Sequence, residues 1–204
     1  IITINGQKLD DRTQAVTANF INDGKTLQLV VYTPRNNFEK VWTGVENNIW
    51  DTTTENWNLG SAKSDFYFYD AALFNLNDGS KNEINIAGKI LLSGMKVEGD
   101  ADYTFTGGAL SIDSSGSRYL PEDIKYKDQL VMAGSGTLTL KNGSSSDPNV
   151  LSEIIVSSGT LAIDGDVAVK RKNGSAKVDV NVGQNGTLLA LGETSLGNMN
   201  VTIN

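Results

Sequence analysis

The sequence predicts an all-β protein built as a parallel β-helix, a solenoid with coils of roughly 20–30 residues. Two observations lead to this fold class. Short runs of alternating apolar and polar residues fill most of the 204-residue chain, and helical periodicity is nearly missing. Such runs, bounded by Gly, Asn, Asp and Ser, are typical of strands and turns. The second observation is a motif that recurs at the spacing expected of stacked repeats.

The alternating runs extend from the first third of the chain to its last residue. They read "TLQLVVY", "DFYFYD", "EINIAGKILL", "YTFTGGALSID", "GTLTL", "GTLAID", "AKVDVNV", "TLLAL" and "MNVTIN". Only the segment "DPNVLSEIIVSS" could hold a turn of helix. There the β-branched residues Ile154, Ile155 and Val156 favour a strand that follows the proline turn.

A Gly-Thr-Leu motif marks the recurring coil. It occurs in "GSGTLTLKNG", "SSGTLAIDGD" and "GQNGTLLALGE", where Gly136, Gly159 and Gly186 are 23 and then 27 residues apart. A looser copy, "TGGALSIDSSG", places Gly108 another 28 residues upstream, and a more distant one is "NDGKTLQLVVY" at residues 22–32. Recurrence at this period indicates a solenoid, in which each coil packs only on its neighbours.

Side-chain alternation explains how such coils would be stabilised. In each copy the glycine would form a corner, and the apolar side chains at alternate positions, such as Leu138 and Leu140, would point inward. Stacked coils would align these side chains into an apolar ladder while the backbones form hydrogen bonds between coils. A β-sandwich would instead turn every ~8–12 residues without repeating its sequence at the longer period.

The length of the chain allows one large domain or two small ones. We expect a single β-helix over residues 1–204, with an irregular part at residues 1–80 and more regular coils at residues 81–204. The start, "IITINGQKL", lacks the basic and apolar segments of a signal peptide. Because these first residues already have the pattern of a strand, the chain is predicted to be an internal piece of a longer protein.

All three tryptophans lie in one polar block, "VWTGVENNIWDTTTENW", at residues 41–57. This block, together with the Gly-Thr-Leu coils, resembles the passenger domains of Gram-negative autotransporters of the pertactin-like and AIDA-like type. The coils are similar to the passenger-associated repeat of that family, and the block is similar to its W-x-G…W…N-W segment. The resemblance covers most of the chain and is weakest at residues 60–100.

The resemblance implies a right-handed parallel β-helix displayed at the surface of a Gram-negative outer membrane or secreted from it. It also implies a function in cell adhesion, self-association or virulence, with the export regions outside this sequence. We therefore expect a non-enzymatic module whose partner is a host or bacterial surface glycan, a surface protein, or another copy of the chain. Two alternatives stay open: a polysaccharide-active β-helix enzyme, and a purely structural stalk.

Composition excludes several classes of function. The chain has a net charge of −7, no cysteine and no histidine. An acidic surface repels phosphate backbones, so we expect no nucleic-acid partner. Disulfides, thiolate or imidazole metal ligands and a Ser-His-Asp triad are impossible without these residue types. No apolar run approaches the ~20 residues of a membrane-spanning helix. We also expect no catalytic residue, no metal and no cofactor.

The candidate binding residues are aromatic. Trp42, Trp50 and Trp57 could present flat faces to a sugar or a partner protein. Their spacings of eight and seven residues do not place them on one strand face, so we favour packed residues of an irregular coil. In "FYFYD", alternation predicts a strand with Phe66 and Phe68 toward the core, and with Tyr67 and Tyr69 as an exposed stripe.

Carboxylates and basic residues complete the candidates. Glu98, Asp100 and Asp102 in "VEGDADY", and Asp164 and Asp166 in "AIDGDVAV", place paired acids on one side of the chain. Calcium would require about six to eight oxygen ligands from several loops, so solvated turn residues are the simpler interpretation. The run "VKRKNGSAKV", with Lys170, Arg171, Lys172 and Lys177, could contact an anionic glycan or lipopolysaccharide, but it is also typical of a solvated loop. The serines of "NGSSSDPN" have no accompanying base, which favours a surface loop.

Overall fold

The computed structural model of the chain describes residues 36–77, 81–117, 120–164, 177–191 and 198–204 in full. It also describes the backbone of five strands, at residues 3–4, 7–8, 15–21, 26–32 and 169–171. These residues form an all-β protein with about 55% strand, as predicted. Among them the short 3-10 helix η1 (Ser114–Gly116) is the only helix, and no helix long and apolar enough to cross a membrane occurs.

The chain divides into two compact units, residues 1–36 and 37–204. In the first unit β1 (Thr3–Ile4) and β2 (Gln7–Lys8) pair antiparallel, as do β3 (Ala15–Ile21) and β4 (Thr26–Tyr32). The prediction that residues 22–32 form a distant coil is therefore wrong. Only four residues separate β3 from β4, and a connection that short joins antiparallel strands, whereas parallel strands need a crossover of about a dozen residues.

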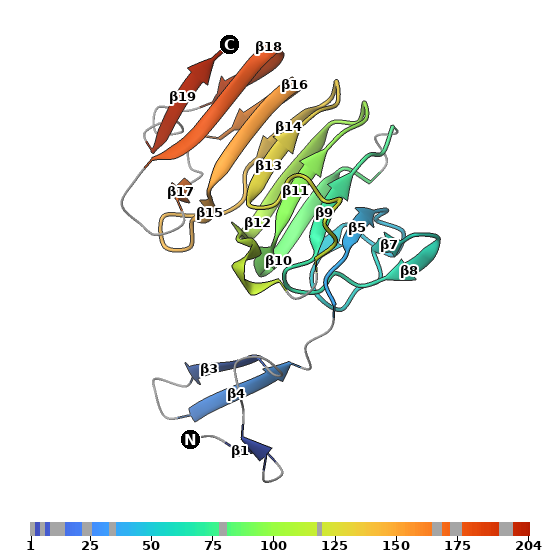
Figure 1. Ribbon diagram of the computed structural model, residues 1–204, viewed down its shortest axis with the longest axis vertical. Coiled ribbons are helices and arrows are strands. Elements are labelled where there is room, and N and C mark those ends of the chain that lie inside the picture. Colours follow the sequence, from blue (N-terminus) through green and yellow to red (C-terminus); the bar gives the residue numbers. More distant parts are fainter. Residues whose placement is uncertain are drawn as a thin grey trace. The chain divides into compact units, whose positions relative to one another are not determined.

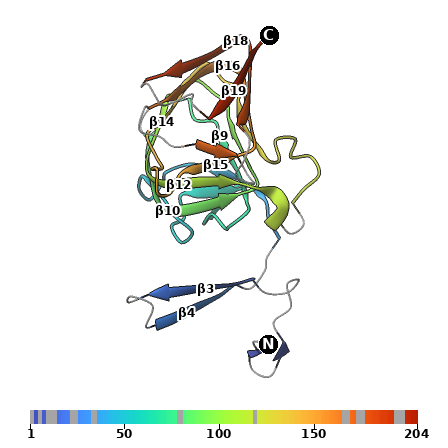
Figure 2. The same cartoon turned by 90° about the vertical axis from the view of Figure 1, so that its left-hand side faces the viewer.

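The second unit is a parallel β-solenoid of about five turns, which confirms the predicted fold class. Its strands form three parallel ladders, which we call the first, second and third faces (Figures 1 and 2). The first face contains β5 (Glu39–Trp42), β9 (Ala71–Phe74), β11 (Gly94–Val97), β13 (Gln129–Met132), the first halves of β16 (Glu153–Ile163) and β18 (Val178–Ala190), and β19 (Met199–Ile203). The right-handed sense of the coils stays a prediction.

The other two faces follow in chain order within each coil. The second face contains β6 (Ile49–Trp50), the first halves of β10 (Glu83–Leu92) and β12 (Tyr103–Ile112), β14 (Thr137–Leu140), and the second halves of β16 and β18. The third face contains the second halves of β10 and β12, with β15 (Asn149–Leu151) and β17 (Val169–Arg171). The long strands β10, β12, β16 and β18 thus bend around a corner and belong to two faces.

The register confirms the three close copies of the motif. Thr137 pairs with Thr160 and Thr160 with Thr187, while Gly159 pairs with Gly186. The strand predicted after the proline turn is also present, as β16. Inside the regular coils the ladder columns are mainly apolar: Met95, Leu130, Ile154 and Val180 stack in register and are fully buried. Burial of each such side chain contributes about 1.5–3 kcal/mol, so the stacked columns are the main source of stability.

The looser copy at Gly108 is out of register. Leu138 pairs with Tyr103, whereas Leu110 lies on the third face and pairs with Ile90. Glycine occurs at more than one corner of the coil, so a Gly-x-Leu pattern alone does not identify which corner it occupies. From Tyr103 to Leu138 the coil has 35 residues, which is longer than predicted because it contains an excursion.

The excursion, residues 113–117 and 120–128 of the described chain, is called the strap. It packs on the outer surface of the first face, where Ile124 and Tyr126 form a small second core with Ala71. The Tyr126 hydroxyl donates to Glu39 Oε2 at 2.5 Å. Burial raises the pKa of Tyr126, and its hydrogen bond to Glu39 and the nearby negative charges add to this. The strap thus connects a middle coil to the first strand of the solenoid.

Candidate binding groove

The tryptophans are packed residues, as predicted. Trp42, Trp50 and Trp57 have no exposed surface, and they form one aromatic cluster with Phe66 and Phe74. The ring centroids of Trp57 lie 5.1 Å from Trp42 and 5.0 Å from Trp50, within the usual range for interacting rings. The Trp42 indole donates to the Lys81 carbonyl at 2.9 Å. None of the three indoles is exposed to a sugar ring, so they do not form a ligand platform.

The segment "FYFYD" is not a strand, so that prediction is wrong. Residues 65–70 form a turn, in which Tyr69 has a left-handed backbone with φ of +68°. Phe66 is buried but Phe68 is only half-buried, and Tyr67 and Tyr69 are half-buried as well. The Tyr69 ring lies against Gly116, where a side chain would overlap it. Alternation is a poor guide here because hydrogen bonds to the Asp70 carboxylate determine the backbone.

Asp70 holds this turn. Its carboxylate accepts hydrogen bonds from the backbone nitrogens of Phe38 and Tyr67, both at 3.0 Å. Burial raises the pKa of the Asp70 carboxyl, although these bonds and the nearby Lys40 act in the opposite direction. Lys40 occupies an inward position of the first face, where its ammonium is buried. The sequence analysis missed this buried pair, because a lysine within a strand is normally expected at an exposed position.

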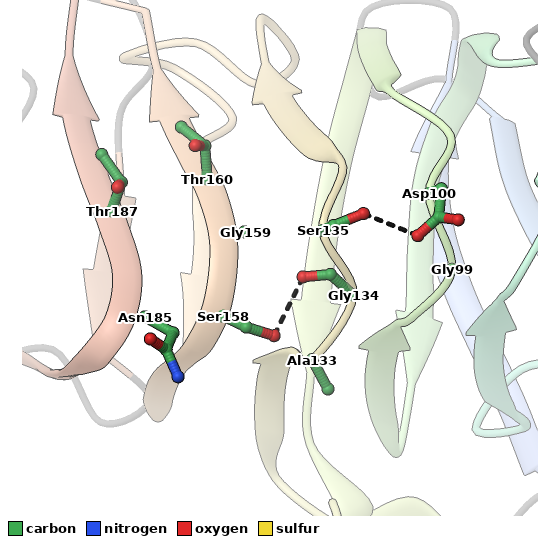
Figure 3. A pocket seen from close by; sticks show the side chains of 10 residues that line it. All are labelled: Gly99, Asp100, Ala133, Gly134, Ser135, Ser158, Gly159, Thr160, Asn185 and Thr187. Atoms are coloured by element: carbon green, nitrogen blue, oxygen red, sulfur yellow. Dashed lines mark hydrogen bonds between the residues drawn. The ribbon is translucent and has the colours of Figure 1, made fainter.

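A groove lies where the first face turns into the second. It is open to solvent, has a volume of about 620 Å³ and crosses four successive coils. Figure 3 shows its small polar side chains on neighbouring strands. The lining residues are Gly99, Asp100, Ala133, Gly134, Ser135, Ser158, Gly159, Thr160, Asn185 and Thr187. We call this feature the corner groove.

Close backbone contact between coils keeps the corner groove shallow and concave. A Cβ atom at Gly134 would lie 2.0 Å from the Gly99 carbonyl oxygen. Gly159 has a φ of +69°, which favours glycine, and a Cβ there would meet the carbonyl oxygens of Gly136 and Gly134 at 2.5 and 2.6 Å. Since no side chain fits at these positions, the backbone itself forms the floor of the groove.

The walls of the corner groove contain both hydrogen-bond donors and hydrogen-bond acceptors. The Ser135 hydroxyl donates to Asp100 Oδ1 at 2.6 Å, and the Ser158 hydroxyl donates to the Gly134 carbonyl at 2.9 Å. Thr160 and Thr187 continue the lining on the second face. A hydroxyl both donates and accepts, so these residues suit a ligand that is itself rich in hydroxyl groups.

The predicted carboxylates have different surroundings. Of the residues that the structure describes, Asp100 is the only ionisable one that lines the corner groove. Asp102 is exposed and accepts from the backbone nitrogen of Thr137 at 2.7 Å. Glu98 forms an ion pair with Lys96, Asp164 is half-buried after β16, and Asp166 lies outside the described residues. In the part of the chain that the structure describes, no three acidic residues are grouped to hold a metal ion.

The remaining polar candidates lie at the surface or outside the residues that the structure describes. The three serines of "NGSSSDPN" are exposed, and the Ser144 backbone nitrogen donates to the Asp147 carbonyl at 2.9 Å. Lys177 is exposed. Lys170 and Arg171 belong to β17, whose side chains are not described, and Lys172 lies outside the described residues. The prediction of a basic contact site therefore stays a prediction.

Comparison with known proteins adds no relative. Neither a family model, nor a curated protein, nor a solved structure matches the chain. The resemblance to autotransporter passengers therefore stays a prediction, and the function has to be argued from the solenoid and the corner groove.

Proposed function

We propose that the chain is a non-enzymatic cell-surface module, a fragment of an autotransporter adhesin passenger, and that it binds a surface glycan in the corner groove. The observation that carries this proposal is the lining of the groove. Four successive coils contribute hydroxyls, an amide and backbone groups to it, and Asp100 is the one carboxylate among the described lining residues. Such a surface can hold a ligand by many hydrogen bonds, and the described lining residues include no second acid or base for hydrolysis.

The charge of the chain and the length of the corner groove restrict the class of ligand further. The net charge of −7 and the carboxylate of Asp100 disfavour a polyanion. Neighbouring strands lie ~4.8 Å apart, so four coils span roughly 15 Å along the solenoid axis. A short stretch of a neutral oligosaccharide fits this length and can match hydroxyl to hydroxyl on successive coils.

A glycan array with the purified chain tests the proposal. Ala133 is exposed in the groove, so Ala133→Trp would fill the groove without removing a hydrogen bond. We expect it to weaken binding to the best glycan by at least about tenfold, or 1.4 kcal/mol. The matched control is Ala87→Trp, which adds the same ring at an exposed alanine of β10 outside the groove. An array without any bound glycan, or equal losses in both variants, would contradict a groove site.

The alternatives give different results in the same set of proteins. An enzyme would shorten an acidic or neutral polysaccharide in a viscosity assay, and Asp100→Asn would abolish that activity, since Asp100 is the groove carboxylate. Self-association would appear in analytical ultracentrifugation as a mass that rises with concentration and would not depend on Ala133. A stalk would be monomeric, inactive and without a glycan ligand.

A further inference from the structure

The buried pair of Lys40 and Asp70 lies at the end of the solenoid that the tryptophans close. The Lys40 ammonium nitrogen is 4.0 Å from Asp70 Oδ2, and the side chains are 3% and 0% exposed. The same nitrogen donates to the Ser64 hydroxyl at 2.5 Å. Two charges held away from water cost several kcal/mol each by rough estimates, and their attraction offsets this only with excellent geometry. At 4.0 Å the ammonium nitrogen and the carboxylate oxygen are buried together but are farther apart than the atoms of a hydrogen bond.

The two carboxylate oxygens of Asp70 have different partners, and this arrangement favours nucleophilic attack at the carboxyl carbon. Oδ1 accepts from the Phe38 backbone nitrogen at 3.0 Å and from Asn37 Nδ2 at 3.3 Å. Oδ2 accepts from the Tyr67 nitrogen at 3.0 Å and is the oxygen that faces the lysine. Two N–H donors on one carboxyl oxygen resemble an oxyanion hole, which stabilises negative charge that develops on that oxygen.

We propose that Lys40 and Asp70 condense into an intramolecular isopeptide bond, a covalent amide between the lysine nitrogen and the aspartate carboxyl carbon. One proton first moves from the ammonium to Oδ2, which gives a neutral amine and a neutral acid. The amine attacks the carboxyl carbon, and Oδ1 carries the negative charge between the Phe38 and Asn37 donors. A second proton passes from the nitrogen to Oδ2, the bond from carbon to Oδ2 breaks, and one water molecule leaves.

Burial supplies the driving force for this step. The reaction replaces two buried charges by one neutral amide, so the desolvation cost of the ion pair disappears. Burial also raises the pKa of the Asp70 carboxyl, which favours the neutral acid that the attack requires. The product would join β5 to the turn before β9, thirty positions along the chain. In a chain without cysteine, this amide would take the place that a disulfide holds in other extracellular proteins.

Intact mass spectrometry of the purified, folded chain under denaturing conditions tests the proposal. We expect a mass one water molecule below the value calculated from the sequence, and a branched peptide after proteolysis that contains Lys40 and Asp70. Lys40→Gln should show its full calculated mass. The matched control is Lys63→Gln, because Lys63 also contacts a carboxylate, Glu46, at 2.6 Å but both side chains are about half exposed. This variant should keep the loss of one water.

The wild-type mass alone decides the question, even if Lys40→Gln does not fold. Blue-shifted fluorescence of the buried tryptophans establishes that the wild-type sample is folded. A folded sample that retains the full calculated mass overturns the proposal. So does a branched peptide at an exposed pair, such as Lys89 and Asp147 at 3.1 Å, because burial would then not be what selects the reacting pair.

Discussion

The aromatic end of the solenoid, residues 37–74, and its regular coils, residues 129–163 and 178–190, are stabilised in different ways. The regular coils repeat one register, in which threonine pairs with threonine and leucine with leucine on successive strands. The aromatic end has no such repeat. It contains the antiparallel hairpin of β7 (Trp57–Leu59) and β8 (Ala62–Ser64), a buried ion pair and side-chain caps on the turns.

The difference follows from the position of each region in the stack. An inner coil is covered on both sides by its neighbours, so small changes of sequence are tolerated if the column stays apolar. At the aromatic end, β5 pairs with β9 of the next coil on one side and with the antiparallel strand β7 on the other. The large rings of this end pack together, and each ring touches several others. The two regions should consequently respond differently to mutation.

The largest expected effect is the loss of a ring at the aromatic end. Trp57→Ala should lower the free energy of unfolding by about 3–5 kcal/mol, because it removes contacts to Trp42, Trp50, Phe66 and Phe74 and leaves a cavity. Urea unfolding followed by circular dichroism measures this change. Leu189→Ala, at an exposed position of β18, should change stability by less than about 0.5 kcal/mol.

The opposite ranking would show that the aromatic end is loosely packed. If the two variants had equal stability, the rings would contribute little, and the comparison between the two regions would fail.

The next largest effect concerns the strap, which connects the two regions. A Cβ atom at Gly94 would lie 2.1 Å from the Tyr126 carbonyl oxygen, so Gly94→Ala must displace the strap or the strand. We expect a loss of about 1–3 kcal/mol, as for other overpacked sites. Gly183→Ala is the control, because its Cβ would meet its nearest neighbour at an ordinary 3.4 Å. Equal unfolding midpoints for both variants would contradict the packing of the strap.

A smaller effect is expected at the far anchor of the strap. Tyr126→Phe removes the hydroxyl that donates to Glu39 and leaves that carboxylate without this bond. The expected loss is about 1–2 kcal/mol. Hydrogen exchange should become faster in residues 120–128 and stay unchanged in β14 and in the second half of β16. Faster exchange throughout the solenoid would mean that the anchor supports the whole stack instead of the strap alone.

Sequence reasoning succeeded where the regular coils dominate and failed where local chemistry does. The Gly-Thr-Leu spacing predicted the stacked register because strand pairing repeats the same side chains at the same positions. It could not reveal the bend at Tyr69 or the burial of Lys40, because both involve one carboxylate, Asp70, that binds Tyr67 nearby and also Phe38 and Lys40 about thirty positions away. The corner groove was also missed, apart from Asp100. Its signal was a series of small residues, Gly134, Ser135, Ser158 and Gly159, at one corner of successive coils.

The smallest effect is a dependence on pH that the aromatic end should show. Asp51 is partly buried, which raises its pKa, but hydrogen bonds from the Thr53 and Thr54 nitrogens at 2.9 and 2.7 Å outweigh this and hold the pKa below its usual 3.8. The folded state therefore binds a proton at Asp51 less readily than the unfolded state. The stability that the charged form provides is present above pH 3.8 and is lost as the pH falls through the lower, folded pKa.

Asp51→Asn tests this last point, because an amide cannot titrate. The variant should be less stable than the wild type at neutral pH, by up to about 1 kcal/mol for a capping carboxylate of this kind. The gap should close as the pH falls below 3.8, when the wild-type carboxyl becomes protonated. Urea unfolding at several pH values, followed by tryptophan fluorescence, reports on this loop because Trp50 and Trp57 flank it. If the difference in stability between the wild type and the variant does not change with pH, Asp51 stabilises the loop through its shape and not through its charge.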